Sequence, residues 1–186
     1  MELQKFGIKL FFKPNGSYPS KDFIPVFHNW IQKNSVPDHL LIDVIDYSHI
    51  QDGPGIMLIA HEGQVSLDKE NNSPGLLYLR TSKIEGDFQK RFEFVFATLL
   101  NTAKLLHNNE IGTNVDFETK AFRFIANDRL LAENNEDNQS IFSKTFNEIL
   151  EKNYPDAKWV IEDYSEMDER LAFTIKFQDD TDIIIN

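Results

Sequence analysis

The segment between residues 46 and 55 holds the side chains best suited to chemistry in this chain. Between two apolar runs, it reads Asp46-Tyr47-Ser48-His49-Ile50-Gln51-Asp52-Gly53-Pro54-Gly55. A nearby carboxylate can orient an imidazole as a general base. His49 with Asp46 or Asp52 would then activate a hydroxyl group or a bound water for attack. One interpretation is therefore a hydrolytic site in which the catalytic residues are His49 as the general base and Asp46 or Asp52 as the carboxylate that orients it.

Two other interpretations of this segment stay open. Glycines accept positive φ and let the backbone approach closely, so the segment also suits the binding of a small ligand or a protein partner. The predicted binding residues are Tyr47, Ser48, Gly53, Gly55, Glu62 and Arg80. Asp, Ser, His and Gly are also ordinary turn residues, which would make the segment purely structural. Arg80 ends a strand, where a rim salt bridge with Glu62 is a simpler role than an anion clamp. We favour non-catalytic binding, because no recognisable catalytic set accompanies the loop.

Spacing excludes several familiar kinds of site. Gly53-Pro54-Gly55 is not followed by a helix whose N-terminal dipole could hold a phosphate, so this is no phosphate or dinucleotide loop. If residues 56–62 form an extended strand rising ~3.3 Å per residue, His61 lies far from His49 and the two cannot share a metal ion. We therefore predict neither a metal site nor a cofactor.

The other histidines have simpler interpretations. Pairing of Tyr47 with Ile56 would bring His61 to the edge of the core, where we expect it to be half-buried. His39, like the two remaining histidines, lies beside or at the end of an expected element. We expect these three side chains to be solvated.

One stretch, residues 38–80, resembles an uncharacterised bacterial protein family. The resemblance rests on the pattern DYSHxxDGPGxxLIxHE from Asp46 to Glu62 and on a later run, Pro74-Gly75-Leu76-Leu77-Tyr78. It implies no activity and gives no residue a role. The interpretation of the segment therefore depends on its residues alone.

The apolar spacing along the chain predicts an α+β fold. Alternation with a period of two predicts strands at 7–13, 40–47, 56–62, 64–67, 76–80, 121–126, 159–162 and 171–177, and a short last one at 183–185. Helical spacing predicts helices at 23–33, 87–108 and 140–153, with Asp22 as the cap of the first. The polar run at 133–139 is expected to be a solvated loop. Antiparallel strands, in one sheet or more, with helices on one face would bury the apolar stripes.

The second half of the chain repeats features of the first. In order, the first half contains Lys33-Asn34, Pro37-Asp38 and, after a strand, Asp46-Tyr47-Ser48. The matching runs of the second half are Lys152-Asn153, Pro155-Asp156 and Asp163-Tyr164-Ser165. We therefore predict one compact domain over residues 1–186, built from two βαββ-type repeats at 1–109 and 115–186 that a long helix joins. Converging turn chemistry is the alternative, since helices often end in this way.

Composition limits the class of protein. The chain of 186 residues has no cysteine, which excludes disulfides and thiolate chemistry. The first residues lack the basic and apolar regions of a signal peptide. No apolar run approaches the ~20 residues needed to span a bilayer, so we expect no membrane partner. These features predict a soluble, cytoplasmic protein.

The net charge of −11 is concentrated in residues 110–186, where 8 basic and 18 acidic side chains give −10. Such a field repels the phosphates of nucleic acid, so we expect none as a partner. The acidic half suits solubility or, alternatively, the inhibition of a basic protein. Exposed sheet edges also leave a homodimer open.

Overall fold

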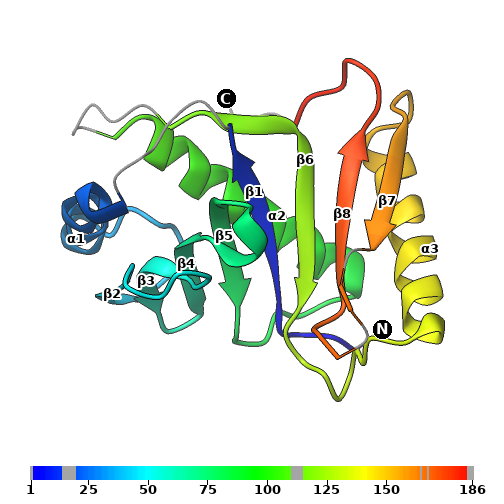
Figure 1. Ribbon diagram of the computed structural model, residues 1–186, viewed down its shortest axis with the longest axis horizontal. Coiled ribbons are helices and arrows are strands. Elements are labelled where there is room, and N and C mark those ends of the chain that lie inside the picture. Colours follow the sequence, from blue (N-terminus) through cyan, green and yellow to red (C-terminus); the bar gives the residue numbers. More distant parts are fainter. Residues whose placement is uncertain (1, 14–19, 110–114, 164, 167, 184–186) are drawn as a thin grey trace.

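Eight strands of the described chain form one antiparallel sheet (Figure 1). The computed structural model describes residues 2–13, 20–109, 115–163, 165–166 and 168–183. The strands are β1 (Phe6–Phe12), β2 (Leu41–Tyr47), β3 (Gly55–Ala60), β4 (Gly63–Asp68), β5 (Gly75–Arg80), β6 (Phe117–Ala126), β7 (Trp159–Asp163) and β8 (Ala172–Phe177). Their order across the sheet is β2-β3-β4-β5-β1-β6-β8-β7, so β1 and β6 are neighbours in its interior. The α+β class and the antiparallel pairing predicted from the sequence are confirmed.

Three α-helices and two short 3-10 helices are the other elements of the described residues. They are α1 (Phe23–Lys33), α2 (Phe88–His107), α3 (Glu136–Asn153), η1 (Ser20–Asp22) and η2 (Glu70–Asn72). Asp87 caps α2, since its carboxylate accepts a hydrogen bond from the amide of Lys90. Figure 1 shows α2 behind the sheet and η2 in front of it. The two faces of the sheet therefore have different surroundings.

The core fills the side of the sheet that α2 contacts. Phe6 of β1 is fully buried there, and the ring of Phe88 from α2 lies 5.5 Å from it between centroids. The same Phe88 ring lies 6.1 Å from that of Phe124 in β6. Such aromatic pairs add to the burial of apolar surface that stabilises the fold. Because successive side chains of a strand point to opposite faces, Lys9 and Arg123 lie on the other face of the sheet, the face towards η2.

The start of α3 and the cap of α1 differ from the prediction. α3 begins at Glu136, so the loop predicted at 133–139 is wrong over its second half. The Asn135 side chain accepts a hydrogen bond from the Asn138 amide, and two acidic residues in the first turn interact favourably with the helix dipole. α1 begins as predicted, but Asp22 makes no side-chain capping bond and the predicted cap is wrong.

The hairpin of β2 and β3 has a different register from the predicted one. Tyr47 pairs with Gly55 rather than with Ile56, so the pairs from Asp43 to Tyr47 differ by one residue from the predicted ones, and a bulge between Leu41 and Asp43 changes the register once more. The length of the turn fixes the register of a hairpin, and alternation alone does not reveal it. β3 ends before His61, whose side chain lies in the following turn and is 70% exposed. The half-buried position predicted for His61 is wrong.

Two predicted features lie partly outside the described residues. They are the strand predicted at 183–185, through its last two residues, and the second Asp-Tyr-Ser run, through Tyr164. Within the described ranges, no helix combines the length and the apolar character needed to cross a membrane.

Candidate functional site

Backbone contacts shape both ends of the 46–55 segment. The Asp46 carboxylate accepts a hydrogen bond from the Ser48 amide at 2.8 Å. Bonds from the Ser48 hydroxyl and amide hold the pKa of Asp46 below its usual value. At the other end Gly55 has φ 63°, and a Cβ there would lie 2.3 Å from the carbonyl oxygen of Leu67. A larger residue at position 55 would therefore collide with β4.

His49 lies on the surface of this segment. Its side chain is exposed, and its ring centroid lies 6.3 Å from that of Tyr47. Asp46 binds a turn amide and Asp52 binds the amide of Asn71, so neither carboxylate is seen to orient the imidazole in the described residues. The catalytic role of His49 stays a prediction.

Asp52 connects the segment to η2. Its carboxylate accepts a hydrogen bond from the Asn71 amide at 2.7 Å, and the Lys69 amide donates to the Gly53 carbonyl at 3.0 Å. Asn71 and Asn72 have φ values of 59° and 50°. This left-handed conformation costs roughly 1–2 kcal/mol for most residues, and Asn tolerates it better. The bonds to the 46–55 segment offset part of that cost and hold η2 in front of the sheet.

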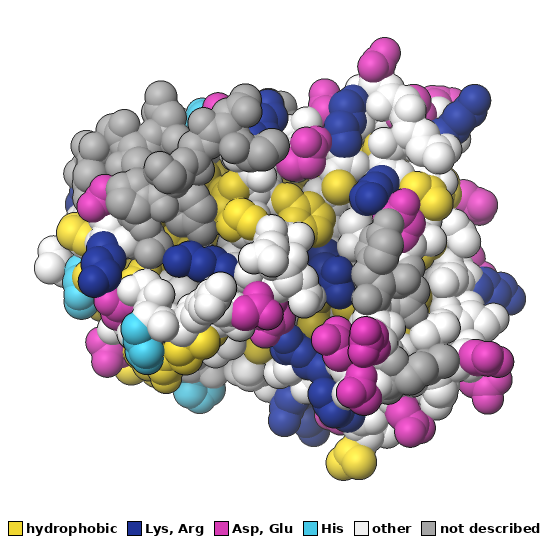
Figure 2. Space-filling view, viewed as in Figure 1, with side chains coloured by type: hydrophobic (Ala, Val, Ile, Leu, Met, Phe, Trp, Pro, Cys, Tyr) yellow, Lys and Arg dark blue, Asp and Glu magenta, His cyan; other side chains and the backbone are white. Residues whose placement is uncertain are grey.

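A polar cavity of about 250 Å³, here called the central cavity, lies on the η2 side of the sheet. Strand residues form its floor: Lys9, Asp68, Arg123, Ile125 and Ala172. The charged residues of its rim are Asp52, Glu70, Arg129, Glu169 and Arg170. Figure 2 shows basic and acidic side chains next to each other on this face of the molecule. The cavity thus joins segments that are far apart in the sequence.

Lys9 and Asp68 form a buried ion pair in the cavity floor. Nζ of Lys9 lies 2.5 Å from the Asp68 carboxylate, and each side chain is only 2% exposed. Burial lowers the pKa of Lys9 below its usual value, because the loss of hydration outweighs the attraction of Asp68. The positive charge of Arg123 also lowers the pKa of Lys9, because Arg123 in β6 is the direct cross-strand partner of Lys9 in β1. Two cations therefore lie side by side in the interior of the sheet.

An ion pair between Glu70 and Arg170 bridges the two halves of the chain at the cavity rim. The Arg170 guanidinium donates to both carboxylate oxygens of Glu70, at 2.8 and 3.1 Å, and to the side-chain oxygen of Asn127 at 3.3 Å. The Arg170 side chain is 30% exposed and the Glu70 side chain 37% exposed. Solvent screening therefore limits the stability that this ion pair adds to less than about 1 kcal/mol. The pair connects η2 with the loop before β8.

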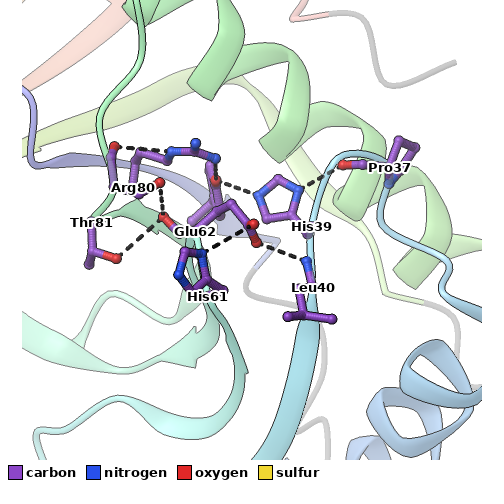
Figure 3. A network of polar contacts seen from close by, with 9 residues as sticks. Pro37, His39, Leu40, His61, Glu62, Arg80 and Thr81 are labelled. Carbon is purple, nitrogen blue, oxygen red and sulfur yellow. Dashed lines mark hydrogen bonds and ion pairs between the residues drawn. The ribbon is translucent and has the colours of Figure 1, made fainter.

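Glu62 and Arg80 belong to a separate network of polar contacts at the end of β5 (Figure 3). The Arg80 guanidinium donates to the Tyr78 hydroxyl at 3.3 Å and lies 5.3 Å from the centre of the Phe94 ring. The Glu62 carboxylate instead accepts a hydrogen bond from the Leu40 amide at 2.8 Å. No ion pair joins Glu62 and Arg80 in the described chain, so the predicted salt bridge is wrong.

His39 completes this network. It is 6% exposed, with Nδ1 2.7 Å from the Pro37 carbonyl and Nε2 2.6 Å from the Tyr78 hydroxyl. Because a carbonyl only accepts, Nδ1 of His39 donates to the Pro37 carbonyl, and Nε2 shares a second hydrogen bond with the Tyr78 hydroxyl. Burial raises the pKa of Tyr78. The solvated position predicted for His39 is wrong, and no local signal points to a partner 39 positions away.

The structure brings few of the predicted site residues together. Asp52 lines the central cavity, whereas the rest of the 46–55 segment, Glu62 and Arg80 do not. The sequence interpretation missed Lys9 and Arg123. A signal for both exists, since each is a charged residue inside an apolar strand.

Neither possible metal ligands nor similarity to known proteins indicates a function for this chain. The described residues contain no group of three or more His, Asp or Glu side chains that could hold a metal ion. Comparison with known protein families gives no match for this chain, and a search of curated proteins finds no significant similarity. Inference about function therefore depends on the chemistry of the site.

Proposed function

We propose that this protein binds a small anionic molecule in the central cavity, without catalysis. The observation that carries the proposal is the direct pairing of Lys9 with Arg123 in the floor of a polar cavity. Like charges directly opposite each other on neighbouring strands destabilise a sheet, and an anion bound between them would offset that repulsion. The proposal develops the ligand-binding interpretation of the 46–55 segment, because Asp52 and η2 border the same cavity.

The buried pair of Lys9 and Asp68 supports the proposal. A buried ion pair seldom adds net stability, and a well-packed apolar pair of similar volume is often at least as stable. Stability alone therefore does not explain a lysine at this position in the sheet. Asp68 favours the charged form of Lys9, and an ammonium group at the floor of a cavity can donate to an anion.

The overall charge of the chain makes local cations necessary for anion binding. A net charge of −11 repels anions at long range. At physiological salt that repulsion is screened beyond about 8 Å, whereas partly desolvated contacts inside a cavity are screened much less. Binding would therefore depend on the basic lining residues Lys9, Arg123, Arg129 and Arg170.

Thermal unfolding with simple anions tests the proposal. Phosphate, sulfate and acetate are compared with chloride at constant ionic strength. At ten times Kd, a bound anion adds about 1.4 kcal/mol of stability. For a chain of this size, that should raise Tm by roughly 3–6 °C.

Substitutions separate a specific site from a general salt effect. Lys9→Met and Arg123→Gln should abolish the anion-dependent rise in Tm. Lys104→Gln, an exposed position on α2 with the same change in charge, should retain it. An equal rise in all variants, or none in the wild type, would contradict the proposal.

We also propose that the chain is a duplicated βαββ unit with its helices on one face and the β4–β5 hairpin inserted in the first copy. β1, α1, β2 and β3 follow the same order as β6, α3, β7 and β8. β2 and β7 are the two edges of the sheet. Gly7-Ile8-Lys9-Leu10 would then correspond to Ala121-Phe122-Arg123-Phe124, which makes the two cations equivalent residues. An experimental structure in which the two units do not superpose would contradict this.

A further inference from the structure

We infer that the anion bound in the central cavity also carries an ammonium group, as a short aliphatic α-amino acid does. The inference rests on the proposed anion site and names the chemical class of its ligand. Three features of the cavity support it: the balance of charges in the lining, the carboxylates of the rim, and the apolar part of the floor.

The lining is balanced in charge, with four basic and four acidic side chains. Two ion pairs, Lys9 with Asp68 and Glu70 with Arg170, account for two residues of each sign. A purely negative ligand held by the cations would also lie close to the remaining carboxylates and be repelled by them. A ligand with both charges can interact favourably with both kinds of side chain.

Asp52 and Glu169 are the acidic lining residues outside these ion pairs. Asp52 accepts the Asn71 amide through its Oδ1, and its carboxylate lines the cavity at the rim. Glu169 is exposed on the loop before β8 and forms no ion pair with a described residue. An ammonium group near either carboxylate would form charge-assisted hydrogen bonds, which are stronger than neutral ones.

The cavity floor also has an apolar part. Ile125 and Ala172 are cross-strand partners between β6 and β8, and with Leu77 they form a small cluster apart from the main core. An aliphatic group placed on Ile125 and Ala172 would leave water, which favours binding. The cavity volume of about 250 Å³ equals that of roughly eight water molecules at ~30 Å³ each. This space is large enough for a short amino acid.

Isothermal titration calorimetry with L-valine and two analogues tests the inference. 3-Methylbutanoate lacks the ammonium group, and L-valinamide lacks the carboxylate. All titrations use the full chain at one ionic strength. We expect L-valine to bind at least about tenfold more tightly than either analogue, the ratio that one good charged interaction provides.

Rim substitutions that keep shape and remove charge identify the group that holds the ammonium. Glu169→Gln and Asp52→Asn should each reduce the preference for L-valine over 3-methylbutanoate to a few-fold, without weakening 3-methylbutanoate itself. Glu166→Gln, an exposed position on the same loop outside the lining, is the matched control and should keep the preference. Because Asp52 also holds η2, the exposed Glu169 provides the variant least able to disturb the fold.

The outcomes separate this inference from the proposed function. If 3-methylbutanoate or phosphate binds as tightly as L-valine, and Arg123→Gln abolishes that binding, the inference is overturned and the anion site remains. If none of these probes binds and no anion changes Tm, both fall. If both rim variants leave the preference for L-valine unchanged, the inference is overturned, because the ammonium would then bind elsewhere.

Discussion

The central cavity and the network of His39, Tyr78 and Arg80 place polar side chains in the interior in two different ways. In the network, the Tyr78 hydroxyl meets both His39 and Arg80, and the Arg80 guanidinium lies over the Phe94 ring. In the cavity, charged side chains line an open space of about 250 Å³. Polar groups in the network bond only to other parts of the protein, whereas the charged groups of the cavity, some of them in ion pairs, also border a concave space of the kind in which ligands bind. Burial of a polar residue therefore does not by itself identify a site.

Asp68→Ala should have the largest effect on stability, because it disrupts the charged floor of the cavity. It leaves Lys9 as a buried cation without its carboxylate, which typically costs about 3–5 kcal/mol of the free energy of unfolding. Urea denaturation measures this loss. The double variant Lys9→Met/Asp68→Leu replaces the pair with apolar side chains, and it should recover most of the stability but no anion binding. A stable double variant that still binds the anion would separate the pair from the site.

Tyr78→Phe should have the next largest effect, confined to stability. It removes the hydroxyl that His39 and Arg80 share, and unsatisfied buried groups cost about 1–3 kcal/mol. Tyr154→Phe is the matched control, since the Tyr154 ring packs on Phe177 and its hydroxyl has no hydrogen bond to a described residue. Anion-dependent changes in Tm should be the same in both variants as in the wild type. A weaker response in Tyr78→Phe alone would connect the network to the cavity.

A change to alkaline pH should alter the stability of the protein by less than these substitutions. It distinguishes the two regions, because Lys9 in the cavity and Tyr78 in the network change the stability in opposite directions. The folded state lowers the pKa of Lys9 below 10.5, so the unfolded state binds more protons between the two pKa values. Lys9 therefore makes stability rise as pH increases towards 10.5. The folded state raises the pKa of Tyr78 above 10.0, so Tyr78 makes stability fall as pH increases beyond that value.

Denaturation curves at several alkaline pH values measure these slopes. Relative to the wild type, Lys9→Met/Asp68→Leu should lose the rise, and Tyr78→Phe should lose the fall. If the double variant keeps the wild-type slope, Lys9 does not titrate as a buried group.

His49→Ala should have the smallest effect. The side chain is exposed, and substitutions at such positions usually change stability by less than about 0.5 kcal/mol. Anion binding should also be unchanged, because His49 does not line the central cavity. Loss of anion binding in this variant would indicate that the anion binds at the 46–55 segment. Loss of a hydrolase activity would support the catalytic hypothesis.

Elements with local signals could be predicted closely from the sequence. α1 begins and ends at the predicted residues, Phe23 and Lys33, because its apolar spacing is complete. α3 begins earlier than predicted, since its first turn is polar and only the cap at Asn135 marks it. The register of β2 and β3 was missed by one residue because β3 begins at Gly55 rather than at Ile56, and the length of the turn, which fixes the register of a hairpin, cannot be read from alternation.

Of the residues that line the candidate site, only one at the rim was predicted from the sequence. Asp52 was among the predicted residues, and its carboxylate lies at the cavity rim. Lys9 and Arg123 looked like isolated charges in two strands that are more than a hundred positions apart in the chain. The pairing of β1 with β6 makes them neighbours, and such pairing depends on how whole strands bury their apolar faces.

By itself, the sequence determined the kinds of elements, most of their bounds to within about one residue, and the antiparallel character of the sheet, because these depend on periodicity over a few residues. The tertiary structure alone decided the strand order, and with it the meeting of Lys9, Asp68, Arg123 and Arg170 around one cavity. The physical reason is that charges interact over a few ångströms of space, whatever their separation along the chain.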